Sequence, residues 1–155
     1  MSKNKNVMIK TIATEPLMLC ESVGNSVGQD KFIFKGVFTA CSDENHTVVN
    51  RNNRIYPLKE MMRHMGYLRE QIKNHQLYGE LDHPTDRFET SLKEAAIKIL
   101  DLWIDKDTAC VMGSAQVLDT PNGLILKTLL ESGMPFCVSS RCSGTVDEKT
   151  REVSI

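Results

Sequence analysis

Apolar side chains recur with a helical period in one long stretch of the chain. Between residues 58 and 74 they stand three or four positions apart, at Leu58, Met61, Met62, Met65, Leu68 and Ile72. This period predicts an amphipathic helix, with Pro57 suited to its first turn. We interpret the methionine stripe as core packing of that helix.

Other stretches are rich in β-branched and aromatic residues and predict strands. The expected strands and hairpins are residues 30–40 with a bend at Gly36, residues 77–83 leading to a loop fixed by Pro84, a hairpin of 95–104 and 109–117, a strand at 135–140 that ends on Ser140, and a hairpin within 145–155. A second, short helix is expected at 123–132, stopped by Gly133. Residues 1–16 are polar and are expected to form an irregular arm.

These elements predict an α/β (α+β) domain on a strongly bent, mostly antiparallel sheet with a few helices. The 155 residues are enough for one domain with a hydrophobic core. The contents of 41% hydrophobic and 25% charged residues are ordinary for a globular protein. A net charge of -1 gives no positive field for a nucleic acid. We find neither a signal peptide nor an apolar run of the roughly 18 residues that a membrane span needs, and therefore expect a soluble intracellular protein.

The five cysteines and four histidines are scattered and lack metal-ligand spacing. We expect no metal site, and we expect the cysteines to be reduced thiols that mostly pack in the core.

His83 is the first candidate for chemistry. It follows a predicted strand, precedes Pro84 and lies near Glu80 and Asp82 in the sequence. An imidazole can take a proton from a nucleophile and return it to a leaving group at neutral pH. A lone histidine in a loop is more often solvated or structural, so its position alone does not assign it a role.

Ser139, Ser140 and Arg141 form the second candidate, at the end of a predicted apolar strand. A serine there can present its hydroxyl to a cleft. The backbone N–H groups that follow can meet a developing oxyanion, and Arg141 would add positive charge. The residues alone leave a serine hydrolase as one hypothesis beside a structural role for the serines.

Three motifs occur in a fixed order along the chain. They are Asn50-Arg-Asn-Asn-Arg-Ile-Tyr-Pro57, Tyr78-Gly-Glu-Leu-Asp-His-Pro84 and Gly133-Met-Pro-Phe-Cys-Val-Ser-Ser-Arg141. Together they resemble the prohead core proteases of large tailed phages, which are distant relatives of herpesvirus assemblin. The likeness covers roughly residues 30–145 and includes the strand around Trp103 and the predicted second helix.

The resemblance implies a serine endopeptidase with an assemblin-like barrel that needs no cofactor. It would degrade scaffold and core proteins and trim the major capsid protein inside the prohead, in the host cytoplasm, with cleavage after glutamate. Such a protease would be a homo-oligomer with no nucleic-acid or membrane partner. By the resemblance, His83 is the general base and Ser140 the nucleophile, with Ser139 as the runner-up, and backbone N–H groups near Arg141 with its guanidinium stabilise the oxyanion.

The chain departs from the family pattern at two places. Cys142 stands where the family usually has glycine, and its side chain would crowd an oxyanion pocket if the turn needs positive φ. It also permits a rival hypothesis, in which the Cys142 thiol is the nucleophile and uses His83. Related proteases often carry Ser-His where Ala96-Ile97 stands, so any role of that histidine is absent here.

The third catalytic residue has several candidates. Related proteases place an acid on a strand after the serine, in a stretch that begins like Glu152-Val-Ser-Ile155. Either Glu152 orients His83, or the acid lies beyond a truncated C-terminus and Glu152 is a solvated hairpin residue. Glu80 and Asp82 are the fallbacks, although adjacent strand residues such as Asp82 and His83 point to opposite faces.

Two further expectations concern substrate and processing. Arg51 and Arg54 could line a substrate channel, but a structural loop with solvated arginines is the favoured interpretation. Ala13-Thr-Glu15 resembles the small-x-Glu cleavage signal of some of these proteases, so residues 1–15 are a candidate pro-segment that is removed by cleavage after Glu15. Residues 16–155 would then be the protease domain. A non-catalytic capsid-assembly protein that shares the fold is the alternative function.

Overall fold

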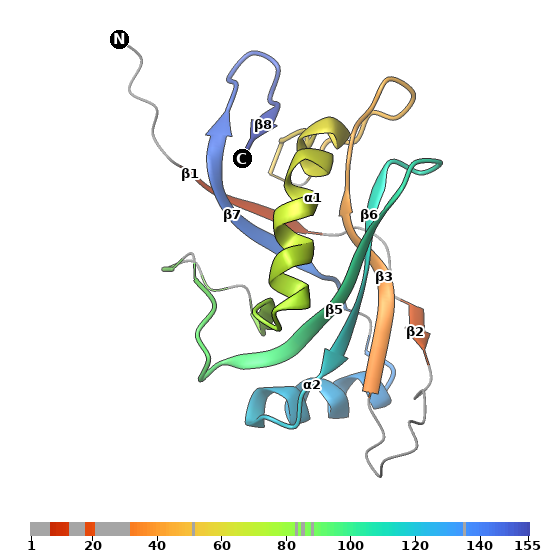
Figure 1. Ribbon diagram of the computed structural model, residues 1–155, viewed down its shortest axis with the longest axis vertical. Coiled ribbons are helices and arrows are strands. Elements are labelled where there is room, and N and C mark those ends of the chain that lie inside the picture. Colours follow the sequence, from red (N-terminus) through yellow and green to blue (C-terminus); the bar gives the residue numbers. More distant parts are fainter. Residues whose placement is uncertain are drawn as a thin grey trace.

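The computed structural model describes residues 7–12, 18–20, 32–50, 52–82, 84, 86–87, 89–134 and 136–155, with the backbone alone for the first two ranges. Its elements follow the order β1 (Val7–Ile12), β2 (Met18–Cys20), β3 (Phe32–Ala40), α1 (Leu58–Lys73), β4 (Tyr78–Glu80), β5 (Ala95–Asp105), β6 (Cys110–Val117), α2 (Pro121–Glu131), β7 (Ser139–Val146) and β8 (Val153–Ser154) (Figure 1).

The strands form two sheets. One has five strands in the order β2-β3-β6-β5-β4, and the other has three in the order β1-β7-β8; every strand pair is antiparallel. The register shifts between Val37 and Thr39 in β3 and between Ile99 and Asp101 in β5, and such bulges bend a strand. Figure 1 shows the strong curvature of β5. The predicted fold class is confirmed. The bend was expected at Gly36, and the irregularity in β3 lies just after that residue.

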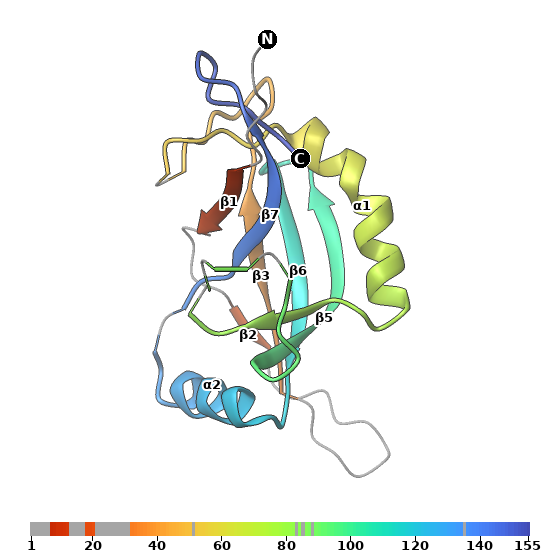
Figure 2. The same ribbon diagram turned by 90° about the vertical axis from the view of Figure 1, so that its left-hand side faces the viewer.

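Helix α1 packs on β5, and its buried side chains are Leu58, Met61 and Met65. Met62, which was also in the predicted stripe, is exposed. Figure 2 shows α1 on one side of the five-stranded sheet and β1 with β7 on the other. The core between these layers contains Phe34, Phe38, Tyr56, Leu102, Val111, Leu126, Leu130 and Val153, among others.

Helix α2 begins earlier than expected because its first turn is capped. The Thr120 hydroxyl accepts a hydrogen bond from the Gly123 N–H at 3.1 Å, and Pro121 occupies the first turn, an arrangement that favours helix initiation. The helix ends at Glu131, and Gly133 adopts a φ of 84°. The expected glycine stop is therefore present, since left-handed backbone favours glycine.

Two local predictions were wrong. The N-terminal segment contains strand β1, whereas we expected residues 1–16 to be irregular; β1 pairs with β7 from Ile12↔Ser139 to Val7↔Gly144. The strand expected at 135–140 instead begins at Ser139 and continues to Val146. The serine pair therefore opens a strand that is stabilised by a partner from the start of the chain.

Candidate active site

The motif Tyr78–Pro84 begins in strand β4 and runs beyond the end of that strand. Strand β4 ends at Glu80, and Asp82 is exposed with a φ of 62°, a left-handed conformation that aspartate tolerates better than most residues. His83 itself lies outside the described residues, while its neighbours Asp82 and Pro84 lie within them. The strand expected at 77–83 is therefore shorter than predicted, since it covers Tyr78–Glu80 and the described residues Leu81, Asp82 and Pro84 lie after its end.

The serine pair lies at the first two positions of β7. Ser139 is opposite Ile12 and Ser140 is opposite Thr11 in strand β1. Both hydroxyl oxygens are buried, and neither has a hydrogen-bond partner among the described residues. Successive side chains of a strand point to opposite faces, so Ser139 shares a face with Arg141 and Ser140 shares the other with Cys142.

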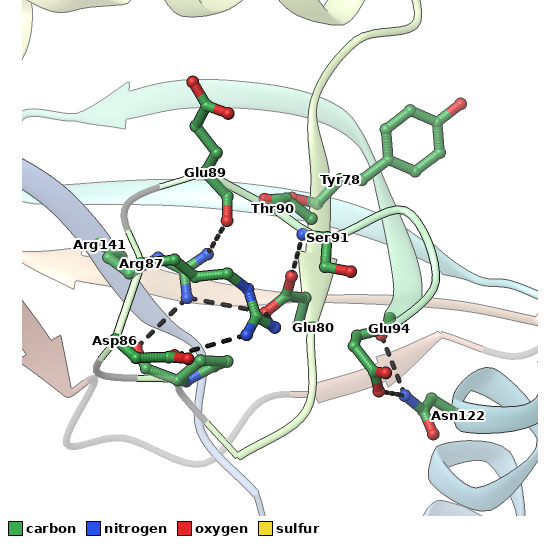
Figure 3. Close-up of polar contacts among 11 residues, drawn as sticks. Tyr78, Glu80, Asp86, Arg87, Glu89, Thr90, Ser91, Glu94, Asn122 and Arg141 are labelled. Atoms are coloured by element: carbon green, nitrogen blue, oxygen red, sulfur yellow. Dashed lines mark hydrogen bonds and ion pairs between the residues drawn. The ribbon is translucent and has the colours of Figure 1, made fainter.

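Arg141 joins the start of β7 to the histidine loop. Its Nη1 donates to the Pro84 carbonyl at 3.3 Å, and its Nη2 donates to the Glu89 carbonyl at 3.1 Å. Pro84 directly follows His83, and Arg141 directly follows Ser140. Two of the three sequence motifs therefore meet in space through one guanidinium (Figure 3).

Glu80 lies at the centre of these contacts. Its side chain is only 2% exposed, and its carboxylate accepts hydrogen bonds from Arg87 Nη2 at 2.9 Å and from the Ser91 N–H. Arg141 Nη1 lies 3.6 Å from the same carboxylate. Glu80 was predicted only as a fallback catalytic acid, and Arg87 was not predicted at all. A buried carboxylate requires cationic partners, but the burial of Glu80 is visible only in the structure, so the sequence carries no signal for Arg87.

Glu152 lies far from the serine pair along β7. It precedes β8, whose Val153 pairs with Val146, six positions beyond Ser140; at the strand rise this is about 20 Å. Its backbone bridges to Ile55, and it borders a cavity of about 520 Å³ with Ser42, Lys59 and Met62. The structure therefore does not bring Glu152 together with Ser140.

Cys142 has the opposite electrostatic setting from an activated thiol. Burial raises the pKa of Cys142 to about 11, although the charge of Arg54 lowers it in part. Reactive cysteines have a lowered pKa, because the thiolate is the nucleophile. The setting of this thiol therefore argues against the rival hypothesis of a cysteine nucleophile.

Hydrogen bonds to the Asn50 side chain shape the loop before α1. The Asn50 side chain accepts from the N–H groups of Asn52 and Arg54, and Tyr56 is a buried core residue. These contacts agree with the structural interpretation of the loop. Arg51, and also Glu15 with its candidate cleavage signal, lie outside the described residues.

The part of the chain that the structure describes contains no group of three or more histidine, cysteine, aspartate or glutamate side chains able to hold a metal ion. Neither of its helices has the length and apolar character required to cross a membrane.

Known proteins are similar to this chain in sequence and in fold. A sequence profile of the family described as prohead core protein serine protease matches residues 5–155. The prohead core protein protease of Enterobacteria phage T4 is 33% identical over 124 residues, which cover 78% of this chain and 57% of that protein. The chain thus spans little more than half the length of this curated relative.

A solved structure agrees with the sequence matches. The structure described as the bacteriophage T4 capsid assembly protease, gp21, superimposes with a TM-score of 0.84 and 27% identity, and covers 97% of this chain and 91% of that chain. From the profile match over residues 5–155 and the identity over most of its length, we conclude that the chain belongs to the prohead core protein serine protease family.

Proposed function

We propose that this chain is a serine endopeptidase of the phage prohead. It would degrade scaffold and core proteins and trim the major capsid protein, with cleavage after glutamate. It would act within the prohead in the host cell and assemble as a homo-oligomer. The observation that carries the proposal is the contact between Arg141 and the Pro84 carbonyl, because it joins the residue after Ser140 to the residue after His83.

The proposed mechanism is acyl transfer without a cofactor. The Ser140 oxygen attacks the peptide carbonyl, and His83 takes the serine proton and returns it to the leaving amine. Backbone N–H groups at the start of β7 would stabilise the oxyanion. We leave the Arg141 guanidinium out of this step, since it donates to two loop carbonyls. We do not assign Glu152 as the third residue, because its place beyond β7 separates it from Ser140.

Ser139 is tested beside Ser140 because of the face of β7 on which it lies. Alternation along β7 puts Ser139, and not Ser140, on the face of Arg141, and the Arg141 side chain meets the histidine loop. The motif resemblance favours Ser140, because related proteases share a Ser-x-Gly turn. The two serines therefore serve as matched variants for each other.

The experiment is to incubate the core and major capsid proteins of the same phage with the wild-type chain, Ser140→Ala, Ser139→Ala and His83→Ala. Fragments are identified by mass spectrometry. We expect cuts after glutamate with the wild type, a loss of about 10³-fold or more in Ser140→Ala and His83→Ala, and retained cleavage in Ser139→Ala. The reverse pattern would make Ser139 the nucleophile, and fragments ending in other residues would overturn the glutamate preference.

The non-catalytic alternative also has a specific observation in its favour. Both serine hydroxyl oxygens are buried, whereas a nucleophilic oxygen has to reach the carbonyl carbon of its substrate. If purified wild-type chain neither cuts these substrates nor reacts with a fluorophosphonate probe, a structural role in capsid assembly becomes the better assignment.

Self-processing at Glu15 is a separate proposal, supported by the Ala13-Thr-Glu15 resemblance to a small-x-Glu signal. We expect the intact mass of the wild-type chain to fall by residues 1–15 on incubation, while Ser140→Ala keeps them. Retention of Met1 in fully active enzyme would show that no such removal is needed.

A further inference from the structure

We propose that Glu80 and Arg141 are positioning residues for the proposed protease. With Arg87 they form a clamp, here called the Glu80–Arg141 clamp, that holds Pro84 and Glu89, which follow His83 in the sequence, against the start of β7 with its serine pair. The inference rests on the proposed function for its catalytic consequence. The clamp itself rests on contacts between described residues (Figure 3).

The arginine half of the clamp fixes the loop at two points. The Arg141 side chain is 11% exposed. One of its terminal nitrogens donates to the carbonyl of Pro84 and the other to the carbonyl of Glu89, five residues further along the loop. A guanidinium presents its donors in a rigid planar fork, so it fixes direction as well as distance. A lysine ammonium would keep the charge but not this geometry.

The glutamate half fixes the base of the loop. Glu80, the last residue of β4, accepts from the Ser91 N–H on the returning chain. Beside it, the Thr90 hydroxyl donates to the Tyr78 carbonyl at 3.2 Å. These contacts close the two ends of the loop on each other, so the segment that carries His83 starts and finishes at fixed positions.

The charges of the clamp depend on one another. The Glu80 carboxylate is almost completely buried and faces the guanidiniums of Arg87 and Arg141, while Asp86, the other carboxylate near Arg87, is exposed. Removing one member of a buried ion pair leaves an uncompensated charge, which is strongly destabilising. Neutralising Glu80 would therefore leave two cations facing each other and release the loop from β7.

The position of the clamp makes it a device for catalytic geometry. General-base catalysis requires the imidazole to lie within hydrogen-bond distance of the serine oxygen, and reactive geometry tolerates errors of only about 0.5 Å. Arg141 is linked to Ser140 by one peptide bond and holds the carbonyl of the residue after His83.

The test measures the rate of phosphonylation by a fluorophosphonate probe in the full chain. The active serine oxygen forms a bond to phosphorus, fluoride leaves, and the serine proton passes to the base. The variants are Glu80→Gln and Arg141→Lys. The matched controls are Glu70→Gln and Arg69→Lys. They introduce the same chemical changes at two exposed positions on α1, away from the clamp.

We expect both clamp variants to lower the rate constant of phosphonylation at least tenfold and to flatten its dependence on pH. The reason is that the base is no longer held within hydrogen-bond distance of the serine hydroxyl. The controls should stay within twofold. A purely structural role would reduce the labelled fraction, as unfolded chain accumulates, but would leave the rate constant and pH profile of the folded fraction unchanged. That result would overturn the clamp as a positioning device. If Glu80→Gln does not fold, Arg141→Lys decides the question, since it keeps the charge opposite Glu80.

Hydrogen exchange supplies a readout that does not depend on activity. We expect peptides that cover residues 82–90 to exchange faster in Arg141→Lys than in the wild type, with β5 and β6 unchanged. Unaltered exchange in the loop would show that the clamp does not hold it. Faster exchange in the variant, combined with a wild-type serine pair that the probe fails to label, would overturn the proposed function and leave the clamp as a structural feature only.

Discussion

At the scale of single residues, Ser139 and Ser140 differ by the face of β7 toward which each hydroxyl points. The motif order predicted both serines and the histidine as candidates. The choice between the serines depends on the phase of the strand, and the phase depends on where β7 begins. We predicted a strand that ends at Ser140, whereas the strand begins at Ser139. The sequence pattern therefore could not decide which of the two serines points to which face.

Residue chemistry also predicts the reactivity of the thiols. Burial raises the pKa of Cys142 to about 11 and that of Cys41 to about 12, while Cys137 is exposed. At pH 8, a thiol with a pKa near 11 holds about 100-fold less thiolate than an ordinary cysteine. We expect iodoacetamide to modify Cys137 well before Cys142 or Cys41 in the native chain, as measured by peptide mass spectrometry.

The same experiment tests the thiol nucleophile. Cleavage activity should survive modification of Cys137. Rapid modification of Cys142 with parallel loss of activity, persisting in Ser140→Ala, would select a thiol hydrolase instead.

At the scale of elements, the helices were predicted well because their signals are local. The periodic apolar positions of α1 and the glycine after α2 act within one turn of the chain. Strand β1 was missed because it carries the polar residues Lys10 and Thr11 and is stabilised by pairing with β7. Its partner strand is far away in the sequence, and no local pattern indicates that the two strands pair.

The two glycines at helical positions predict opposite effects of the same substitution. A Cβ on Gly123, in the first turn of α2, would lie 1.8 Å from the Leu118 carbonyl oxygen, whereas one on Gly66 in α1 would meet nothing within 4 Å. We expect Gly123→Ala to lower the free energy of unfolding by about 1–3 kcal/mol, the range for overpacking. Gly66→Ala should raise it by about 0.5–1 kcal/mol through helix propensity.

Urea unfolding of both variants measures these changes. Equal stabilities for the two alanine variants would contradict the close approach between α2 and the chain that precedes it.

At the scale of the whole molecule, the C-terminal strand β8 is tied to α1 of the other layer. The Glu60 carboxylate accepts from Arg63 Nη2 at 2.5 Å and from the Ile155 N–H at 2.8 Å. Because α1 packs on β5, this carboxylate links the three-stranded sheet to the five-stranded one. Sheet order, and with it this contact, depends on long-range pairing that the periodicity of single segments does not encode.

The link predicts a dependence of stability on pH. The hydrogen bond from Arg63, followed by those from the Ile155 N–H and the charges of Arg63 and His64, holds the pKa of Glu60 below its ordinary value of 4.5. A lowered folded-state pKa stabilises the fold above the unfolded-state pKa, and this contribution is lost as the pH falls through the folded value. We expect Glu60→Gln to be less stable than the wild type at pH 7 and to lose less stability on acidification.

Thermal unfolding at pH 7 and at lower pH values checks this expectation, with Glu70→Gln as the control, since Glu70 is 66% exposed on the same helix. If the two glutamine variants respond equally to pH, Glu60 does not link the sheets in the way that its contacts indicate.

The pairing of β1 with β7 has a consequence for the order of folding. Thr11 lies opposite Ser140, so all the residues between these two positions must be synthesised before this pair can form. Contacts of such high sequence separation form slowly, because the entropy of closing a long loop opposes them. In pulse-labelled refolding, the amides shared by β1 and β7 should gain protection later than those of the β5–β6 hairpin. A nascent chain would then complete the strand surroundings of its serine pair only at the end of folding.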